Sequence, residues 1–175
     1  MPERLDVYLR PLQLEDAKVS YKWRNNPLVW KHTGSAPNCE VTLEMEMQWL
    51  SKALADSSTK RYAICLKHNN RYIGNAYLSD IVDARAEEQI FIGDPMLWGR
   101  GLGTKARLEL YKIAQTELGI TVIESNIRTR NLASLKSVLR CGFEEVSRTD
   151  EWVKLRKIMG GWGIVAVMSS WRDAA

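Results

Sequence analysis

The sequence predicts an α/β protein built on a mixed, mostly antiparallel sheet. The predicted strands and helices do not follow the regular strand–helix–strand alternation that is typical of a parallel sheet. Two strand-like segments, residues 62–66 and 72–78, flank His68-Asn69-Asn70 and predict an antiparallel hairpin with a turn-forming centre. The chain has 175 residues, which suits one hydrophobic core. We therefore expect a single domain over residues 1–175.

The composition is that of an ordinary soluble domain. Hydrophobic residues make up 45% and charged residues 26% of the chain, which excludes a disordered, collagen-like or transmembrane protein. Lys and Arg outnumber Asp and Glu by 25 to 21, and no polybasic run occurs. A net charge of +4 is too small to indicate nucleic acid, and it suits a small anionic ligand better. No apolar stretch approaches the roughly 20 residues of a membrane helix, so no membrane partner is expected.

The cysteines indicate a reducing compartment. Cys39, Cys65 and Cys141 are scattered, form no CxxC pair, and are accompanied by only two histidines. This pattern predicts free thiols and no metal site. The start of the chain, Met-Pro-Glu-Arg-Leu-Asp, has no apolar segment of the secretory kind. Together these observations predict a cytoplasmic location.

In the first third of the chain we expect one strand and two helices. Residues 7–9 predict a short strand that Arg10-Pro11 ends, and residues 15–25 predict a helix with acidic residues in its first turn. Asn25-Asn26-Pro27 is typical of a turn. Thr42 is a candidate N-cap for the second helix, whose apolar positions 43, 47, 50 and 54 follow helical spacing.

After the hairpin, helices and strands are interleaved. The spacing predicts a strand over 90–92, closed by Gly93-Asp94-Pro95, and a helix over 104–118. A β-branched strand over 121–123 follows. Cys141-Gly142 ends a helix over 131–140. The last expected strands cover residues 143–146 and 164–168.

The segment from Trp98 to Ala106 carries the strongest chemical signal. Gly99, Gly101 and Gly103 alternate just before a helix, where backbone N–H groups and the helix dipole can bind an anion such as a pyrophosphate. Arg100 and Lys105 add positive charge beside them. The spacing does not fit a P-loop, and the third glycine comes one residue too early for a Rossmann fingerprint.

This segment resembles the acetyl-CoA loop of the GNAT N-acetyltransferase superfamily, whose consensus is Q/R-x-x-G-x-G/A. Trp98 occupies the Q/R position, as it does in the branch that includes ribosomal-protein N-terminal acetyltransferases. Two further stretches are similar to that branch and extend the resemblance over residues 5–168. They are Leu9-Arg10-Pro11-Leu12 with Glu15-Asp16-Ala17, and Asn131-Leu132-Ala133-Ser134 up to Cys141-Gly142-Phe143.

The resemblance implies a six- or seven-stranded sheet that splays open at its fourth strand and is flanked by about four helices. It also implies that acetyl-CoA is the cosubstrate, with the pantetheine arm in the gap and the pyrophosphate on the glycine loop. Asn131 is implied as a pantetheine contact, although it is an equally good N-cap for the helix that follows it. Ser134 is a weaker candidate. By family resemblance, residues 164–168 are a candidate for pairing in a homodimer. The implied acetyl-CoA residues are Ile90, Phe91, Ile92, Trp98, Gly99, Arg100, Gly101, Leu102, Gly103, Thr104, Asn131 and Ser134.

Acetyl transfer to an amine needs a base, because an ammonium has no free electron pair. Glu87 lies where this branch has a strand-borne glutamate, and it shares a strand face with Gln89 and Phe91. Glu88 shares the other face with two isoleucines that look core-facing, so we favour Glu87. A register change of one residue would exchange the two, and Glu88 stays an alternative.

The acid that protonates the departing thiolate stays unassigned. Many superfamily members have a tyrosine four residues before the glycine of the GF pair, and this chain has Val138 there. Either the thiolate leaves without a tyrosine, or Ser137, another residue or water provides the proton.

Three features point to different acceptors. The stretch from Tyr21 to Pro27 looks like that of sugar-nucleotide amine acetyltransferases, and Glu87-x-Gln89-Ile90 looks like the spermidine acetyltransferase strand. The Trp-Gly-x-Gly loop is similar to that of N-terminal acetyltransferases. A polyamine would need clustered carboxylates, and an acceptor site would need walls. The candidates are Glu40, Glu44, Glu46, Glu87 and Glu88 for the carboxylates, and Trp23, Trp30 and Trp49 for the walls.

The expected function is therefore acetyl-CoA-dependent N-acetylation of a primary amine through a tetrahedral intermediate. The acceptor is a small molecule, such as a polyamine or an amino sugar, or a protein N-terminus. The alternative is a catalytically silent acyl-CoA-binding or regulatory module, which the departures at Trp98 and Val138 would explain.

Overall fold

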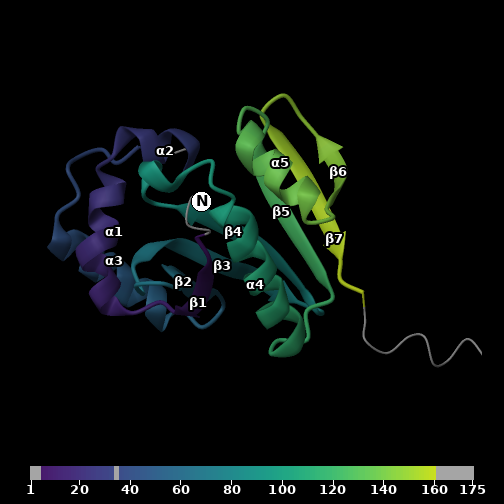
Figure 1. Ribbon diagram of the computed structural model, residues 1–175, viewed down its shortest axis with the longest axis horizontal. Helices are drawn as coiled ribbons and strands as arrows, with labels where there is room; N and C mark the ends of the chain where they lie inside the picture. Colours follow the sequence, from purple (N-terminus) through teal and green to yellow (C-terminus); the bar gives the residue numbers. More distant parts are fainter. Residues whose placement is uncertain (1–4, 34–35, 161–175) are drawn as a thin grey trace, which may run out of the picture.

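The computed structural model describes residues 5–33 and 36–160, and their strands form one seven-stranded sheet in the order β1-β2-β3-β4-β5-β7-β6 (Figure 1). Neighbouring strands are antiparallel except for the parallel pair β4 and β5. The prediction of a mixed, mostly antiparallel sheet is confirmed. The strands are β1 (Val7–Pro11), β2 (Lys60–Leu66), β3 (Tyr72–Val82), β4 (Arg85–Ile92), β5 (Val122–Arg128), β6 (Glu144–Arg148) and β7 (Trp152–Ile158).

Helices cover both faces of the sheet. On one face α1, α2 and α3 pack over β1–β4, and on the other α4 and α5 pack over the centre of the sheet. The described residues thus hold five α-helices where about four were expected. The bounds are α1 (Ala17–Arg24), α2 (Pro27–Thr33), α3 (Leu43–Ala55), α4 (Leu102–Thr116) and α5 (Leu132–Arg140), with short 3₁₀ helices η1 (Leu14–Asp16) and η2 (Pro95–Leu97).

The additional helix is α2, which starts inside the segment expected to be a turn. Asn26 Oδ1 accepts a hydrogen bond from the Leu28 N–H at 3.0 Å, and Pro27 stands at the first helical position. Proline fits that position because its missing N–H would have no partner there. The Asn-Pro pair therefore ends α1 and begins α2.

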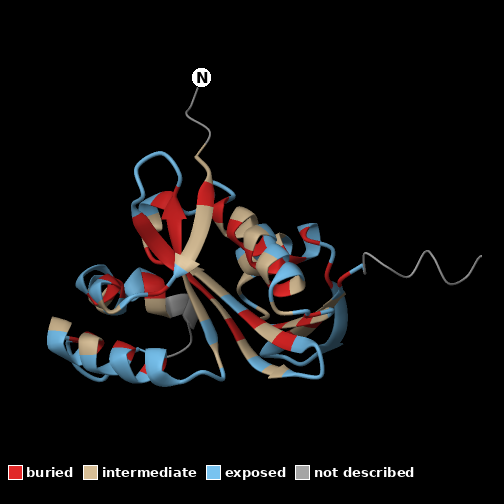
Figure 2. Ribbon diagram, turned by 90° about the horizontal axis from the view of Figure 1, so that it is seen from below, coloured by how far each residue is buried: buried red, intermediate tan, exposed pale blue. Residues whose placement is uncertain are grey.

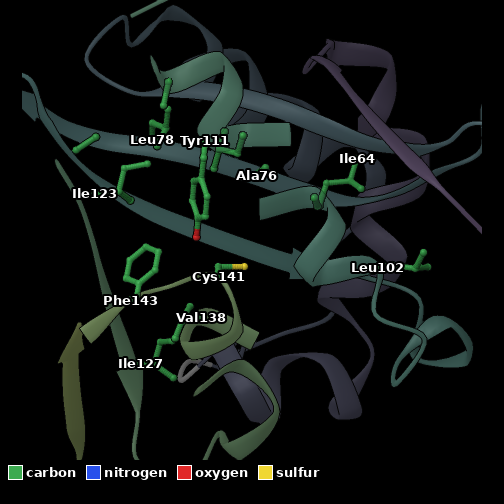
Figure 3. Close-up of a cluster of buried hydrophobic side chains, with 14 of the residues drawn as sticks. Ile64, Ala76, Leu78, Leu102, Tyr111, Ile123, Ile127, Val138, Cys141 and Phe143 are labelled. Carbon is green, nitrogen blue, oxygen red and sulfur yellow. The ribbon is translucent and has the colours of Figure 1, made fainter. Parts of the chain in front are cut away.

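The main core lies between the sheet and the α4–α5 layer. Leu102, Tyr111 and Phe143 belong to it, and Figure 3 shows Tyr111 reaching toward Cys141 and Phe143. A second, smaller core lies under α1–α3, where the Trp23 ring contacts the Tyr72 ring with 4.7 Å between centroids. Figure 2 shows that the buried residues gather in the strands and on the inner faces of the helices. The two cores confirm that both faces of the sheet are covered.

Two predicted helix starts are confirmed by their caps. Thr42 Oγ1 accepts from the Met45 N–H at 3.2 Å, and Asn131 Oδ1 accepts from the Ser134 N–H at 3.2 Å. The last strand of the described residues lies earlier in the chain than the expected strand over 164–168. The structure has β7 at Trp152–Ile158, which was not predicted, and residues 164–168 with their proposed dimer pairing lie outside the described residues.

The sheet opens between β4 and β5. These strands pair only at Arg85–Val122, Ala86–Ile123 and Glu87–Glu124. Beyond Glu87, β4 keeps its neighbour β3, and beyond Glu124, β5 keeps its neighbour β7. Figure 1 shows the two strands meeting at one end and then diverging. The expectation of a sheet that splays at its fourth strand is confirmed.

Candidate functional site

A cleft of ≈ 940 Å³ lies where β4 and β5 diverge. Its walls come from α1, α2, α3, β3, β4, the glycine loop, α4, β5, α5 and β7, so distant parts of the chain meet in it. Arg100 is exposed and does not line it. The cleft brings together all the other candidate residues, namely Glu87, Glu88, Ile90, Phe91, Ile92, Trp98, Gly99, Gly101, Leu102, Gly103, Thr104, Asn131 and Ser134.

The glycine loop forms one end of the cleft and is built around left-handed backbone. Gly99 and Gly101 have φ angles of +73° and +76°, which side chains of L-residues rarely adopt. Gly101 is the N-cap of α4, so the amides of Leu102, Gly103 and Thr104 lie in its first turn without intrahelical acceptors. Free amides at the positive end of a helix dipole fit a pyrophosphate.

Trp98 ties this loop to the end of β4. Its indole Nε1 donates to the Ile92 carbonyl oxygen at 2.8 Å. The preceding η2 helix is capped by Asp94, whose Oδ1 accepts from the Met96 N–H at 2.9 Å. The aromatic residue at the Q/R position thus joins the glycine loop to the strand where the expected pantetheine contacts lie.

Glu87 and Glu88 lie on opposite faces of β4, as expected. Glu87 is half-buried at the last position where β4 and β5 pair. Asn126 Nδ2 donates to Glu87 Oε2 at 2.9 Å. Burial raises the pKa of Glu87 above its ordinary value, while the hydrogen bond from Asn126 opposes that shift. A carboxylate with a raised pKa is suited to accept a proton.

Glu88 is instead engaged in a buried ion pair. Its side chain is fully buried, and Arg107 Nε donates to its Oε1 at 2.9 Å. The Tyr111 hydroxyl donates to its Oε2 at 2.5 Å. Burial, together with the neighbouring Glu88 charge, raises the pKa of Tyr111. Both oxygens of Glu88 are therefore occupied, and the prediction that its strand face points to the core is confirmed.

Arg107 extends this network to α5. Its Nη1 donates to Ser137 Oγ at 2.8 Å, and its Nη2 donates to Ser134 Oγ at 3.1 Å. Ser137 also shares a hydrogen bond with the Thr104 hydroxyl at 2.8 Å. One guanidinium thus connects β4, α4 and α5 at the base of the cleft.

Sequence reasoning missed Arg107, Tyr111, Asn126 and Trp152. Arg107 had a readable signal, because it lies on the apolar stripe of its helix between Leu102 and Ala114. A charged residue on a core-facing stripe needs a buried partner. Asn126 was missed because the predicted strand ended at residue 123, and Trp152 was missed because its strand was not predicted.

The face of β4 opposite α4 lines the other half of the cleft together with α1, α2, α3 and β3. We call it the acceptor half, because the sequence predicts the acceptor site here. Trp23, Trp30 and Trp49 all line the cleft, as expected for walls. Trp23 is buried by ring contacts, whereas Trp49 is 42% exposed. Burial raises the pKa of Tyr77, which also lines this half, to about 12.

The structure does not gather the five glutamates named for a polyamine. Glu40 and Glu44 are exposed and lie outside the cleft lining, whereas Glu46, Glu87 and Glu88 line it. Glu88 is paired with Arg107, and Glu46 Oε2 lies 3.6 Å from Arg24 Nη1. Among the described residues, Glu87 is the cleft carboxylate that forms no ion pair.

The described residues hold neither a metal-binding cluster nor a membrane-spanning helix. In residues 5–33 and 36–160, no three His, Cys, Asp or Glu side chains are grouped so that they could hold a metal ion. No helix in the same residues is long and apolar enough to cross a membrane. Cys39, Cys65 and Cys141 are free thiols, as predicted.

Comparisons with known proteins agree with this geometry. The model of the family described as acetyltransferase (GNAT) domain matches residues 6–144. An uncharacterized N-acetyltransferase, p20, from Bacillus licheniformis is 25% identical over 151 residues, covering 85% of this chain and 84% of that protein.

Two solved structures are similar in fold. The spermidine N-acetyltransferase of Vibrio cholerae, in complex with CoA and spermine, superposes with a TM-score of 0.77 at 19% identity, over 88% of this chain and 96% of that one. The aminoglycoside acetyltransferase AAC(6')-Ib, in complex with coenzyme A, has a TM-score of 0.72 at 23% identity, over 87% of this chain and 95% of that one.

Proposed function

This chain belongs to the GNAT acetyltransferase family, and we propose that it transfers the acetyl group of acetyl-CoA to a primary amine, with Glu87 as the base. One observation carries the proposal. The parallel pairing of β4 and β5 ends at Glu87, so the strands diverge beside this glutamate and leave a cleft with an anion-binding loop at one end. Acetyl-CoA is the cosubstrate of the family, and this cleft fits it.

The proposed acetyl-CoA site follows the sequence expectation. The first-turn amides of α4 and the backbone around Gly99 and Gly101 would hold the pyrophosphate. The unpaired inner edge of β4 at Ile90, Phe91 and Ile92 would hydrogen-bond the pantetheine arm. The Ile92 carbonyl oxygen already accepts a hydrogen bond from Trp98, so other backbone groups on this edge would serve the arm. Asn131 and Ser134 line the cleft and would contact the arm from α5.

We assign the base to Glu87 rather than Glu88. Both Glu88 oxygens accept hydrogen bonds inside the core, from Arg107 and Tyr111. Glu87 lies on the acceptor face and has a raised pKa. It would take the proton from the acceptor ammonium and leave a neutral amine, whose electron pair attacks the acetyl carbon. The C–S bond of the tetrahedral intermediate would then break, and CoA would leave as a thiolate that takes up a proton from a donor that we do not assign. Val138, where many family members have a tyrosine, is fully buried in the core, so no acid is assigned there.

The first experiment measures acetyl-CoA binding by calorimetry, and thiol release with polyamines, amino sugars, sugar-nucleotide amines and short peptides. Glu87→Gln should lower kcat by about 10²- to 10⁴-fold, because a general base contributes about that much. Its Kd for acetyl-CoA should stay unchanged. Glu117→Gln, at an exposed glutamate outside the cleft, is the matched control.

Two outcomes would overturn the proposal. Failure to bind acetyl-CoA would contradict the assignment of the cleft. Binding without turnover of any amine, in the wild type, would favour the silent acyl-CoA-binding module instead. Full activity of Glu87→Gln would contradict the choice of base only.

A further inference from the structure

Glu46 is a buried carboxylate in the acceptor half of the cleft with one oxygen unsatisfied. It belongs to α3, is 2% exposed, and lines the cleft. Ser20 Oγ donates to its Oε1 at 2.6 Å. Its Oε2 is buried and has no hydrogen-bond partner. Buried polar atoms nearly always have a partner, because an unpaired one loses its hydration without compensation. Oε2 therefore points to a missing group.

Arg24 lies beside this oxygen without bonding to it. Arg24 Nη1 is 3.6 Å from Glu46 Oε2, which is longer than a hydrogen bond. Its guanidinium lies over the Trp49 ring, 5.1 Å from the centroid, and its side chain is 42% exposed. Within the described part of the chain, the guanidinium of Arg24 donates no hydrogen bond. The cleft thus presents a free acceptor and free donors next to each other.

A hydroxyl group can bond to both the free Glu46 oxygen and the Arg24 guanidinium. It donates one hydrogen bond, here to Glu46 Oε2, and accepts others, here from the guanidinium. A primary ammonium has three donors and no acceptor, so it would satisfy Glu46 and repel Arg24. A peptide amide carries donor and acceptor on separate atoms, and its chain continues on both sides. It therefore offers no single atom that both donates and accepts at this subsite.

We propose that Glu46 and Arg24 bind a hydroxyl group of the acceptor, and that the acceptor is therefore a hydroxylated primary amine of the amino-sugar or amino-alcohol kind. This inference rests on the proposed function and names its substrate class. Trp49 offers the same subsite a half-exposed aromatic face, which suits the carbon-bound hydrogens of such a molecule. The hydroxyl lies at this subsite while the amine lies at Glu87.

The charges of the acceptor half agree with this class. Glu46 and Arg24 have opposite charges and lie close together, so the subsite as a whole attracts a neutral polar group. Glu87 is left to receive one cationic amine. A linear polyamine would bring further ammonium groups for which the described cleft holds no unpaired carboxylate.

The first test compares amines that differ only in hydroxyl groups. Thiol release would be measured with glucosamine against cyclohexylamine, with 2-amino-1,3-propanediol against isopropylamine, and with spermidine. We expect kcat/KM to be at least 10-fold higher for the hydroxylated member of a pair, and higher than for spermidine. Equal rates within both pairs, preference for spermidine, or turnover of peptides alone would overturn the inference.

The second test uses two substitutions of one side chain. Glu46→Leu removes the acceptor oxygens. It should raise KM for the hydroxylated amine by about 10- to 100-fold, because losing a hydrogen bond to a charged group weakens binding by about that factor. Glu46→Gln keeps a carbonyl oxygen that accepts from a hydroxyl, and should change KM less than about 5-fold. If the bound group were an ammonium, Glu46→Gln would lose the attraction between opposite charges and should raise KM by clearly more than about 5-fold. Glu44→Gln, on the exposed side of the same helix, is the control.

Binding of acetyl-CoA separates this inference from the proposed function. Glu46 lies in the acceptor half, so its variants should bind acetyl-CoA with wild-type Kd, and their thermal unfolding shows whether they fold. If wild type binds acetyl-CoA and acetylates amines without preferring hydroxylated ones, only the subsite assignment fails. If wild type does not bind acetyl-CoA, the proposed function itself fails.

Discussion

Asn126 affects the proposed base through one hydrogen bond. Its Nδ2 donates to Glu87 Oε2, which favours the ionised carboxylate and opposes the raised pKa caused by burial. Asn126→Ala should therefore raise the pKa of Glu87 further. The base is lost as pH falls through that pKa, so the acidic limb of kcat/KM should move to higher pH. A pH–rate profile of both proteins checks this, and an unmoved limb would show that Glu87 does not control it.

Arg107 supports the fold by neutralising a buried charge. It pairs with Glu88, and the two side chains are 5% and 0% exposed. Arg107→Met would leave that carboxylate buried and unpaired, which costs about 3–5 kcal/mol in the free energy of unfolding. Arg107→Met combined with Glu88→Leu should recover most of the loss, because no charge is then left unpaired. Urea unfolding measures both, with Lys112→Met on the exposed face of α4 as the control.

Glu87 and Glu88 show how much of the site could be predicted from the sequence, residue by residue. The two faces of β4 were predictable from the alternation around Ile90 and Ile92, and that alternation separates Glu87 from Glu88. The partner of Glu88 was not predicted, because helical and strand periodicity say which side a residue faces and not which residue it meets. Asn126 lies beyond the predicted strand end, so its contact with Glu87 was hidden as well.

At the scale of one element, the start of α4 depends on backbone that only glycine adopts readily. Gly101 has φ of +76°, and a Cβ there would meet no atom within 4 Å. Gly101→Ala should therefore cost about 1–2 kcal/mol through conformation alone. It should also weaken acetyl-CoA binding, because the first-turn amides would turn away. Chemical unfolding and calorimetry measure the two effects.

Gly103 offers the matched comparison in the same loop. It is helical, and the atom nearest to an added Cβ is Arg107 Nη1 at 3.9 Å. Gly103→Ala should leave the free energy of unfolding unchanged or raise it by up to about 1 kcal/mol. A loss of acetyl-CoA affinity in this variant would then report contact with the ligand itself. Wild-type affinity would place the ligand farther from the helix start than we propose.

Helix starts with a specific cap were predicted, whereas one strand with a readable alternation was overlooked and one turn gave no readable signal. Thr42 and Asn131 identified two helix starts because a cap needs a specific side chain. The segment Trp152–Ile158 alternates apolar and charged residues, with Val153 and Leu155 buried, so its strand was readable and overlooked. The turn from β3 to β4 was not readable, since Asp83 and Ala84 both adopt positive φ and neither residue favours it strongly.

Across the whole molecule, the two parts of the sheet are joined by only three residue pairs between β4 and β5. A ligand that bridges these strands should stabilise the native state. At 100 times its Kd, acetyl-CoA should add about 2.7 kcal/mol to the free energy of unfolding, which raises Tm by roughly 5–11 °C. Thermal melts with acetyl-CoA, and with adenosine as the control, measure this.

Hydrogen exchange should show where the stabilisation arises. Protection should increase most in residues 88–92 of β4 and 125–128 of β5, which each lack a neighbour on one side. A uniform increase without a maximum at the divergence would contradict binding between the strands.

Gly93 follows β4, where a Cβ would lie 2.0 Å from the ring of Trp23. Trp23 lines the acceptor half, while Gly93 directly follows the strand that we propose holds the pantetheine arm. In a library randomised at both positions, functional clones should keep glycine at 93 unless residue 23 becomes small. Enlarging the acceptor pocket by shortening Trp23 would in turn remove the ring that supports this turn. None of the described glycines lies against the Trp49 ring in this way, so new acceptor preferences are more accessible by mutation at Trp49 than at Trp23.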